Sequence, residues 1–137
     1  MTELLSQPTF RIAAIALVAL LAGVVAFAWP RTGGQGITTV SVQDMHAAVG
    51  QGALVLDVRE PYEFDEGHVA GTVLVPLATV AARAGEFDKN APVYVFCRSG
   101  NRSLVAAQTL VEAGYSDVRN VGGGMIAWAS ARLPVER

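Results

Sequence analysis

The segment VYVFCRSGNRSLVAAQTL, residues 93–110, contains the only cysteine of this chain, Cys97. Four strand-forming residues precede the cysteine, and a helix-forming run begins at Ser103, so the polar residues between them form a loop that joins a strand to a helix. The amino terminus of a helix carries a partial positive charge and unpaired amide groups. We therefore expect the start of this helix to stabilise a thiolate or a bound anion in the loop.

Two arginines and a glycine in the loop support the same expectation. Arg98 and Arg102 place positive charges near Cys97, and Gly100 allows the chain to turn so that successive amides face inward as an anion-binding nest. Such surroundings lower the pKa of a cysteine from its usual value of about 8.5. Free cysteines are commonly inert and buried, but the flanking arginines argue against burial here. The local sequence thus predicts a reactive and accessible thiol.

The rest of the domain alternates apolar runs with helical patterns, which is typical of an α/β domain with a largely parallel sheet. In such sheets functional groups gather at the carboxyl ends of the strands, where Asp57 and Cys97 both lie. The predicted strands are residues 53–58, 72–77, 92–96 and 117–121. The predicted helices are one capped by Ser41 and ending at Gly50, one turn beginning at Pro61, and residues 77–84, 103–113 and 125–133.

An uncharged segment, residues 12–29, precedes this domain. It holds 18 residues without a strongly polar side chain, spans roughly 27 Å as a helix, and is flanked by Arg11 and Arg31, which together predict a transmembrane helix. The predicted organisation of the chain is a tail (residues 1–11), the membrane helix (12–29), a glycine-rich linker (30–36) and a globular domain (37–137).

The apolar segment has two interpretations. Ala26-Phe27-Ala28 matches the pattern at which signal peptides are cut, and cleavage near Ala28 would release the domain into the periplasm. The weakly charged amino terminus and the long apolar run favour an uncleaved anchor instead. The positive charges of Arg11 and Arg31 on the two sides of the segment nearly balance. The positive-inside rule therefore only slightly favours an extracytoplasmic domain. We expect a single-pass membrane protein whose domain lies outside the cytoplasm.

Charge and cysteine count exclude several functions. Residues 37–137 contain eight basic and eleven acidic residues, a net charge of −3, so they lack the basic surface that nucleic-acid binding requires. A single cysteine rules out an intramolecular disulfide and Cys-x-x-Cys redox or zinc chemistry within one chain. The sequence also shows no cluster of metal-ligand residues. We expect no cofactor and no metal.

Three segments, CRSGNRS, DVREPYEFDEGHVAGTVLVPL and NVGGGMIAW, together resemble a single-domain rhodanese, which is a sulfurtransferase. They carry four features of that family in its usual order: the Asp-x-Arg at Asp57, the Gly-His before the predicted strand of residues 72–77, the cysteine loop, and the glycine pair with its tryptophan. The likeness covers residues 37–137. It implies a five-stranded parallel sheet flanked by helices, and it implies that Cys97 carries a persulfide during turnover.

The reaction that the resemblance implies is the transfer of a sulfane sulfur. The Cys97 thiolate would attack the outer sulfur of a small-molecule donor such as thiosulfate and expel sulfite. The persulfide would then pass its terminal sulfur to cyanide or to a thiol, including a thiol on a second protein. Cations and loop amides would stabilise the departing anion, and a preformed thiolate needs no general base. The predicted substrate-binding residues are Arg98, Ser99, Gly100, Asn101, Arg102 and Ser103, and the supporting residues are Asp57 and Arg59.

Two other functions remain open. Cysteine-dependent phosphatases place an arginine six positions after the cysteine; here that position is Ser103, and the arginine falls one residue earlier. Related phosphatases and arsenate reductases have a loop one residue longer, and the shorter loop suits a sulfur atom better than a tetrahedral oxyanion bonded to sulfur. A non-catalytic persulfide-binding or sensor module is the second alternative. The presence of Cys97 favours an enzyme over such a module.

Four polar side chains have structural interpretations. We expect Asp57 and Arg59 to form an ion pair that orients the loop rather than to take part in catalysis. His68 is expected to bond a backbone group near the predicted strand of residues 72–77. His46 is expected on an exposed helix without a partner.

Two further runs also have structural interpretations. The acidic run after Arg59 (Glu60, Glu63, Asp65 and Glu66) is expected to form a solvated helical face. The glycines of residues 122–124 are not followed by the lysine of a phosphate-binding loop, so they predict a tight turn before the last helix. Trp128 in that helix is expected in the core.

Overall fold

The structure is a computed structural model that describes residues 36–137. The predicted tail, the predicted membrane helix of residues 12–29 and the linker up to residue 35 lie outside the described residues. Within residues 36–137 no helix has the length and apolarity needed to cross a membrane.

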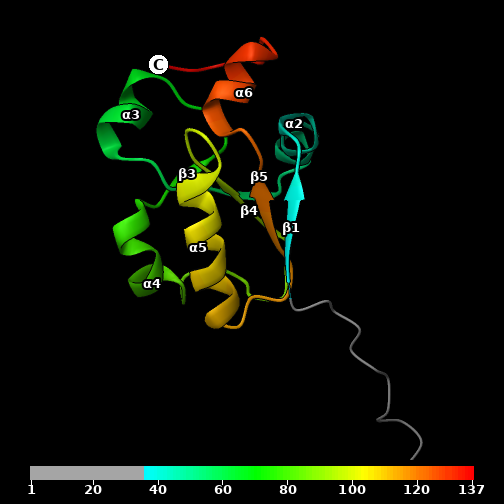
Figure 1. Cartoon of the computed structure of the whole chain (residues 1–137), viewed down its shortest axis with the longest axis vertical. Coiled ribbons are helices and arrows are strands. Elements are labelled where there is room, and N and C mark those ends of the chain that lie inside the picture. The colour runs from blue at the N-terminus through cyan, green and yellow to red at the C-terminus, as the bar shows by residue number, and fades with distance from the viewer. Residues whose placement is uncertain (1–35) are drawn as a thin grey trace, which may run out of the picture. The chain divides into compact units, whose positions relative to one another are not determined.

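The domain is built on five parallel strands in the order β1-β5-β4-β2-β3 (Figure 1). Four of the strands fall inside predicted strands. The fifth, β1, was implied by the resemblance but not found by the pattern of apolar residues, because its two central residues are exposed threonines at the edge of the sheet. The strands are β1 (Ile37–Val40), β2 (Leu54–Asp57), β3 (Val73–Leu74), β4 (Val93–Phe96) and β5 (Val118–Val121).

The helices follow the predicted order with shifted ends. The helix after the cysteine loop begins two residues before Ser103, because Gly100 adopts φ +98° and turns the chain directly into the helix. The predicted helix of residues 77–84 is divided into a 3-10 helix and a short α-helix. The helices are α2 (Val42–Gly50), α3 (Pro61–Glu66), the 3-10 helix η2 (Leu77–Thr79), α4 (Val80–Arg83), α5 (Asn101–Glu112) and α6 (Gly124–Ser130).

The side chains of β4 alternate between two apolar cores. Val93 and Val95 pack in the core beneath α4 and α5, whereas Tyr94 and Phe96 pack in the core with α2 and α6. Because helices cover both faces of the sheet, the strand is apolar at every position. Cys97 continues the alternation and falls in the core on the α5 side. The strand periodicity therefore sets the direction in which the thiol points.

The carboxyl-terminal segment (residues 133–137) returns to α3 (Figure 1). His68 and Glu136 exchange two backbone hydrogen bonds of 2.9 and 2.8 Å, which hold the segment in place. The indole of Trp128, which is buried as expected, donates to the carbonyl of Pro134 at 2.9 Å. These bonds fix the segment beside the carboxyl edge of the sheet.

Candidate active site

Cys97 follows β4 directly and its side chain has no exposed surface. The amide of Gly100 donates a hydrogen bond of 3.1 Å to the sulfur, and the thiol donates to the Ser103 hydroxyl at 3.3 Å. The expectation of an accessible thiol was therefore wrong. The flanking arginines point elsewhere, while the alternation of β4 turns Cys97 itself into the core.

The pKa of Cys97 is nevertheless lowered, as expected. Burial alone raises this pKa. It is lowered more by the hydrogen bonds that the deprotonated sulfur can accept from the Ser103 hydroxyl and from the amides of Ser103, Gly100 and Ser99. The stabilisation of the thiolate therefore comes mainly from the loop's own amides and one hydroxyl. It is a local property of the first turn of α5.

The start of α6 fixes the shape of the loop. The amide of Met125 donates to the carbonyl of Cys97 at 2.8 Å, and the amide of Ile126 donates to the carbonyl of Arg98 at 3.0 Å. This approach needs Gly124, at φ +52°, because a Cβ there would lie 2.5 Å from the carbonyl carbon of Arg98. The glycine run is thus a tight turn before the last helix, as predicted.

A polar residue that the sequence analysis missed, Asn120, lies behind the loop. Its side chain is 5% exposed, its Oδ1 accepts a 2.5 Å hydrogen bond from Ser103, and its Nδ2 donates to the carbonyl of Gly100 at 3.3 Å. Asn120 is near the end of β5, at the same edge of the sheet as Asp57 and Cys97. Functional groups in parallel sheets gather at the carboxyl ends of the strands, and this reasoning, which selected Asp57 and Cys97, could also have identified Asn120.

Arg102 directs its hydrogen bonds to Glu63 and not to the sulfur of Cys97. Its guanidinium forms a bidentate pair with Glu63, and this pair lowers the pKa of Glu63 to about 2. Glu63 is therefore not part of a solvated acidic face, and that expectation was wrong for this residue. The contact could not be read from the sequence because α3 and α5 are far apart in the chain.

Asp57 and Arg59 form a buried ion pair, as expected, but within residues 36–137 none of its side-chain hydrogen bonds reaches the cysteine loop that it was expected to orient. Their side chains are 0% and 4% exposed, and the guanidinium lies 2.7 Å from the carboxylate. Arg59 also donates to the carbonyls of Glu63 and Gly67, at 3.2 and 3.0 Å. The pair therefore connects the end of β2 to the middle and to the carboxyl end of α3.

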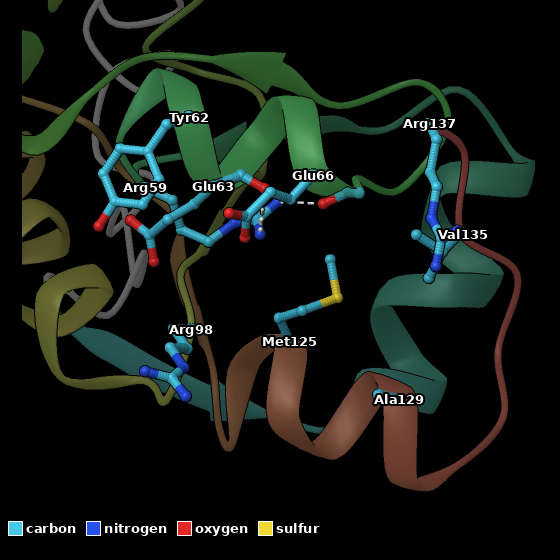
Figure 2. A pocket seen from close by; sticks show the side chains of 10 residues that line it. Arg59, Tyr62, Glu63, Glu66, Arg98, Met125, Ala129, Val135 and Arg137 are labelled. Carbon is cyan, nitrogen blue, oxygen red and sulfur yellow. Dashed lines mark hydrogen bonds between the residues drawn. The ribbon is translucent and has the colours of Figure 1, made fainter.

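A pocket of about 510 Å³ opens beside the loop (Figure 2). Arg98 lies on one side of it and Arg137 on another, and the thioether of Met125 points between them. Neither arginine forms an ion pair with any residue in the described part of the chain. The pocket is lined by Arg59, Tyr62, Glu63, Glu66, Gly67, Arg98, Met125, Ala129, Val135 and Arg137.

The histidines lie outside the loop. His68 Nδ1 is 3.0 Å from the carbonyl of Phe64, and its ring stacks on that of Phe64. The expected bond to a backbone group is therefore present, but its partner lies on α3 and not near β3. His46 is exposed as expected, but its ring contacts the edge of Trp128 with 5.5 Å between centroids. No group of three or more histidine, cysteine, aspartate or glutamate residues in the described range is arranged to hold a metal ion.

Together the fold and the loop define an α/β domain that presents a single cysteine to inward-facing amides at the carboxyl edge of a parallel sheet. The family model described as "Rhodanese-like domain" matches residues 41–131, and the chain belongs to this family. The five-stranded parallel sheet flanked by helices agrees with this assignment.

Individual proteins resemble this chain in sequence or in structure. YrkF of Bacillus subtilis is 43% identical over 74 residues, which cover 54% of this chain but only 40% of YrkF. The thiosulfate sulfurtransferase GlpE of Pseudomonas putida is 41% identical over 86 residues, 63% of this chain and 77% of GlpE. A rhodanese-related protein from Thermoplasma volcanium has a crystal structure with a TM-score of 0.66 and 28% identity, covering 72% of this chain and 97% of that one. Relatives named as sulfurtransferases support sulfur transfer of the rhodanese type as the general function.

Proposed function

We propose that this chain is a sulfurtransferase that carries a sulfane sulfur on Cys97. The observation that carries the proposal is the position of the Cys97 sulfur, 3.1 Å from the Gly100 amide within a loop whose amides and Ser103 hydroxyl favour the thiolate. A thiolate is the nucleophilic form of cysteine. The same donors can stabilise a persulfide anion, because it also carries its negative charge on sulfur.

The proposed reaction has two steps. In the first, the Cys97 thiolate attacks the outer sulfur of thiosulfate, the sulfur–sulfur bond of the donor breaks, and sulfite leaves with the electron pair. In the second, cyanide or a thiolate attacks the outer sulfur of the persulfide, and Cys97 is released as a thiolate. Each step conserves charge and needs no external oxidant or proton.

Arg98 is the proposed binding residue for the anionic donor. It directly follows Cys97, is exposed, lines the pocket and forms no ion pair in the part of the chain that the structure describes. A free guanidinium beside the nucleophile attracts a dianion and stabilises the charge on departing sulfite. Because Cys97 is fully buried, the loop must open slightly before the donor can reach the sulfur.

Two alternatives predict different products. A phosphatase or arsenate reductase would bind a tetrahedral oxyanion in the loop, but the loop is one residue shorter than theirs and Arg102 is paired with Glu63. A non-catalytic carrier or sensor would accept sulfur without rapid release; YrkF has a provisional name as a sulfur carrier protein. The loop geometry favours the enzyme, and the kinetics of sulfur release decide between enzyme and carrier.

The experiment is mass spectrometry of the full chain after incubation with thiosulfate. The proposal expects one added sulfur atom on Cys97, lost on addition of cyanide with formation of thiocyanate. The Cys97→Ser variant is the control and should gain nothing. A wild-type chain that gains no sulfur but hydrolyses an aryl phosphate would overturn the proposal in favour of a phosphatase. A chain that gains sulfur but does not release it to cyanide or a thiol would support a carrier.

The proposed location of this activity is the extracytoplasmic face of a membrane, with residues 12–29 as a single anchor. The support is the sequence alone: 18 uncharged residues bracketed by Arg11 and Arg31. A reporter enzyme that is active only outside the cytoplasm, fused after Arg137, should be active and should sediment with membranes. An inactive reporter would reject the orientation, and a soluble active reporter would indicate cleavage near Ala28.

A further inference from the structure

Asn120 has a fixed orientation behind the cysteine loop. A carbonyl oxygen can only accept hydrogen bonds, so the contact with the carbonyl of Gly100 requires the NH2 group of Asn120 on that side. The Oδ1 atom must then face Ser103, and it accepts the hydrogen of the Ser103 hydroxyl. All three groups are buried, so water does not provide alternative partners.

This arrangement commits the single hydroxyl hydrogen of Ser103. In the neutral state the Cys97 thiol donates to Ser103 Oγ, and Ser103 donates onward to Asn120. When the thiol loses its proton to solvent, the sulfur can only accept hydrogen bonds. The Ser103 hydrogen can then reach the sulfur only by rotating away from Asn120 Oδ1. The thiolate and the Asn120 amide therefore compete for one hydrogen.

We propose that Asn120 is a positioning residue of the sulfur-transfer site, which limits how readily Cys97 becomes a thiolate by holding the Ser103 hydrogen. The inference rests on the proposed role of Cys97 as the nucleophile. The same competition applies to the second step of the reaction. There the acceptor attacks the outer sulfur, the sulfur–sulfur bond breaks, and the electron pair remains on Cys97, which again accepts the Ser103 hydrogen.

The charged groups on the elements around Cys97 do not change when Asn120 is replaced by an uncharged residue such as leucine. They are Asp57 at the end of β2 with Arg59 after it, Glu63 on α3, and Arg98 and Arg102 in the loop and α5. On β5, Arg119 pairs with Asp117 and contacts Tyr94, whose side chain lies in the opposite core. A difference in thiol acidity between wild type and Asn120→Leu therefore reports on the hydrogen bond and not on a change in charge.

The test measures the pH dependence of Cys97 alkylation by iodoacetamide in the full chain. Asn120→Leu removes the competing acceptor, so the thiol pKa should fall by about 0.5 to 1 unit, which corresponds to the worth of one hydrogen bond. Asn120→Asp keeps an acceptor and adds negative charge, so the pKa should rise. If Asn120 merely supported the loop, both variants would disturb the amides and move the pKa towards the usual value of about 8.5.

A double-mutant cycle isolates the role of Ser103. In a Ser103→Ala background the fall caused by Asn120→Leu should disappear, because no hydroxyl hydrogen remains to be shared. A fall that persists in this background, or a wild-type-like or raised pKa in Asn120→Leu, would overturn the inference. Circular dichroism checks folding, and Asn120→Ala serves the same test if the leucine variant does not fold.

A second readout follows the persulfide. Release of sulfur from preloaded Asn120→Leu to cyanide should be about three- to tenfold faster than in wild type, because the leaving thiolate is better stabilised. Alkylation requires no sulfur donor, so failure of the proposed function and failure of this inference are distinguishable. A chain that never takes up sulfur would reject the proposed function. The pKa of Cys97 measured by alkylation would still decide whether Asn120 competes for the Ser103 hydrogen.

Discussion

The guanidinium of Arg102 forms a bidentate pair with the carboxylate of Glu63, with Nη1 2.7 Å from Oε2 and Nη2 2.8 Å from Oε1. Arg102 lies in the first turn of α5, and Glu63 lies on α3, 39 residues earlier. Two parallel hydrogen bonds give the pair a defined direction as well as strength. Arg102 therefore acts on the site chiefly by holding α5, and with it the cysteine loop, against the wall of the pocket formed by α3.

The first prediction concerns the pH dependence of this pair. The hydrogen bond from Arg102 is the largest cause that lowers the pKa of Glu63, from 4.5 to about 2. Because the folded-state pKa is below the unfolded one, the stabilisation is complete above about pH 4.5 and is lost as the pH falls towards about 2. Glu63→Gln should lower the free energy of unfolding by about 1 kcal/mol at pH 7, a value typical of a partly exposed pair.

Urea unfolding of wild type and Glu63→Gln at about pH 7 and about pH 3 measures the effect. The difference between the two proteins should shrink at the lower pH, because Glu63 is then largely protonated in the unfolded state while it is still ionised in the folded state. Glu66→Gln is the control, because Glu66 lies on the same helix but forms no ion pair within the described chain. A difference independent of pH would show that the ion pair is not the source of the stability.

The second prediction concerns the buried pair at the end of β2. Asp57→Asn would leave the guanidinium of Arg59, which is 4% exposed, without a counter-charge. Removing one partner of a buried pair costs about 3 to 5 kcal/mol, and that loss is expected in the free energy of unfolding. Asp117→Asn is the matched control, because the Asp117–Arg119 pair is 36% and 33% exposed and should contribute less than about 1 kcal/mol. Equal losses in the two variants would contradict the argument from burial.

The sequence predicted the central elements of the fold because their pattern follows from burial alone. Strands β2 and β4 are buried on both faces and are therefore continuously apolar, apart from Asp57 at the end of β2. Edge strand β1 pairs only with β5 and exposes Thr38 and Thr39, so it leaves no such pattern. Strand β3 was predicted too long because only Val73 and Leu74 pair with β2, and the apolar residues after them turn into η2.

The candidate site was predictable where its contacts are local. The loop from Cys97 to Ser103 is contiguous in the chain, and its hydrogen-bond donors follow from the helix that begins there. The contacts of Glu63 with Arg102 and of Asn120 with Ser103 join distant segments, so no local pattern indicates them. Burial of Cys97 was missed for a related reason: the charges beside it were given more weight than the alternation of the strand before it.

The third prediction concerns the contact between α6 and the loop. In Gly124→Ala the new Cβ would overlap the carbonyl of Cys97 and would force a residue other than glycine to adopt φ +52°. We expect a loss of about 2 kcal/mol or more in unfolding free energy. The thiol pKa should rise towards its usual value, because displaced amides no longer point at the sulfur.

Thermal unfolding and the pH dependence of iodoacetamide alkylation measure both effects. Gly50→Ala is the control: Gly50 ends α2, and no atom lies within 4 Å of a Cβ built there. Its effect on stability should stay within about 0.5 kcal/mol, without any change in thiol acidity. An unchanged thiol pKa in Gly124→Ala would contradict the prediction. It would show that the loop keeps its amides directed at the sulfur without the contact with α6.

The fourth prediction concerns Arg98 as the binding residue for an anionic donor. In Arg98→Gln the second-order rate of persulfide formation from thiosulfate should fall about tenfold, since the pocket loses a free positive charge next to Cys97. The remaining rate should depend less on salt concentration than in wild type, because screening acts on the charge that was removed. Sulfur release to an uncharged thiol should change little.

Arg132→Gln is the matched control, because Arg132 is also exposed and unpaired among residues 36–137 but does not line the pocket. If both variants slow thiosulfate equally, the effect belongs to the net charge of the domain and Arg98 has no specific part in binding the donor.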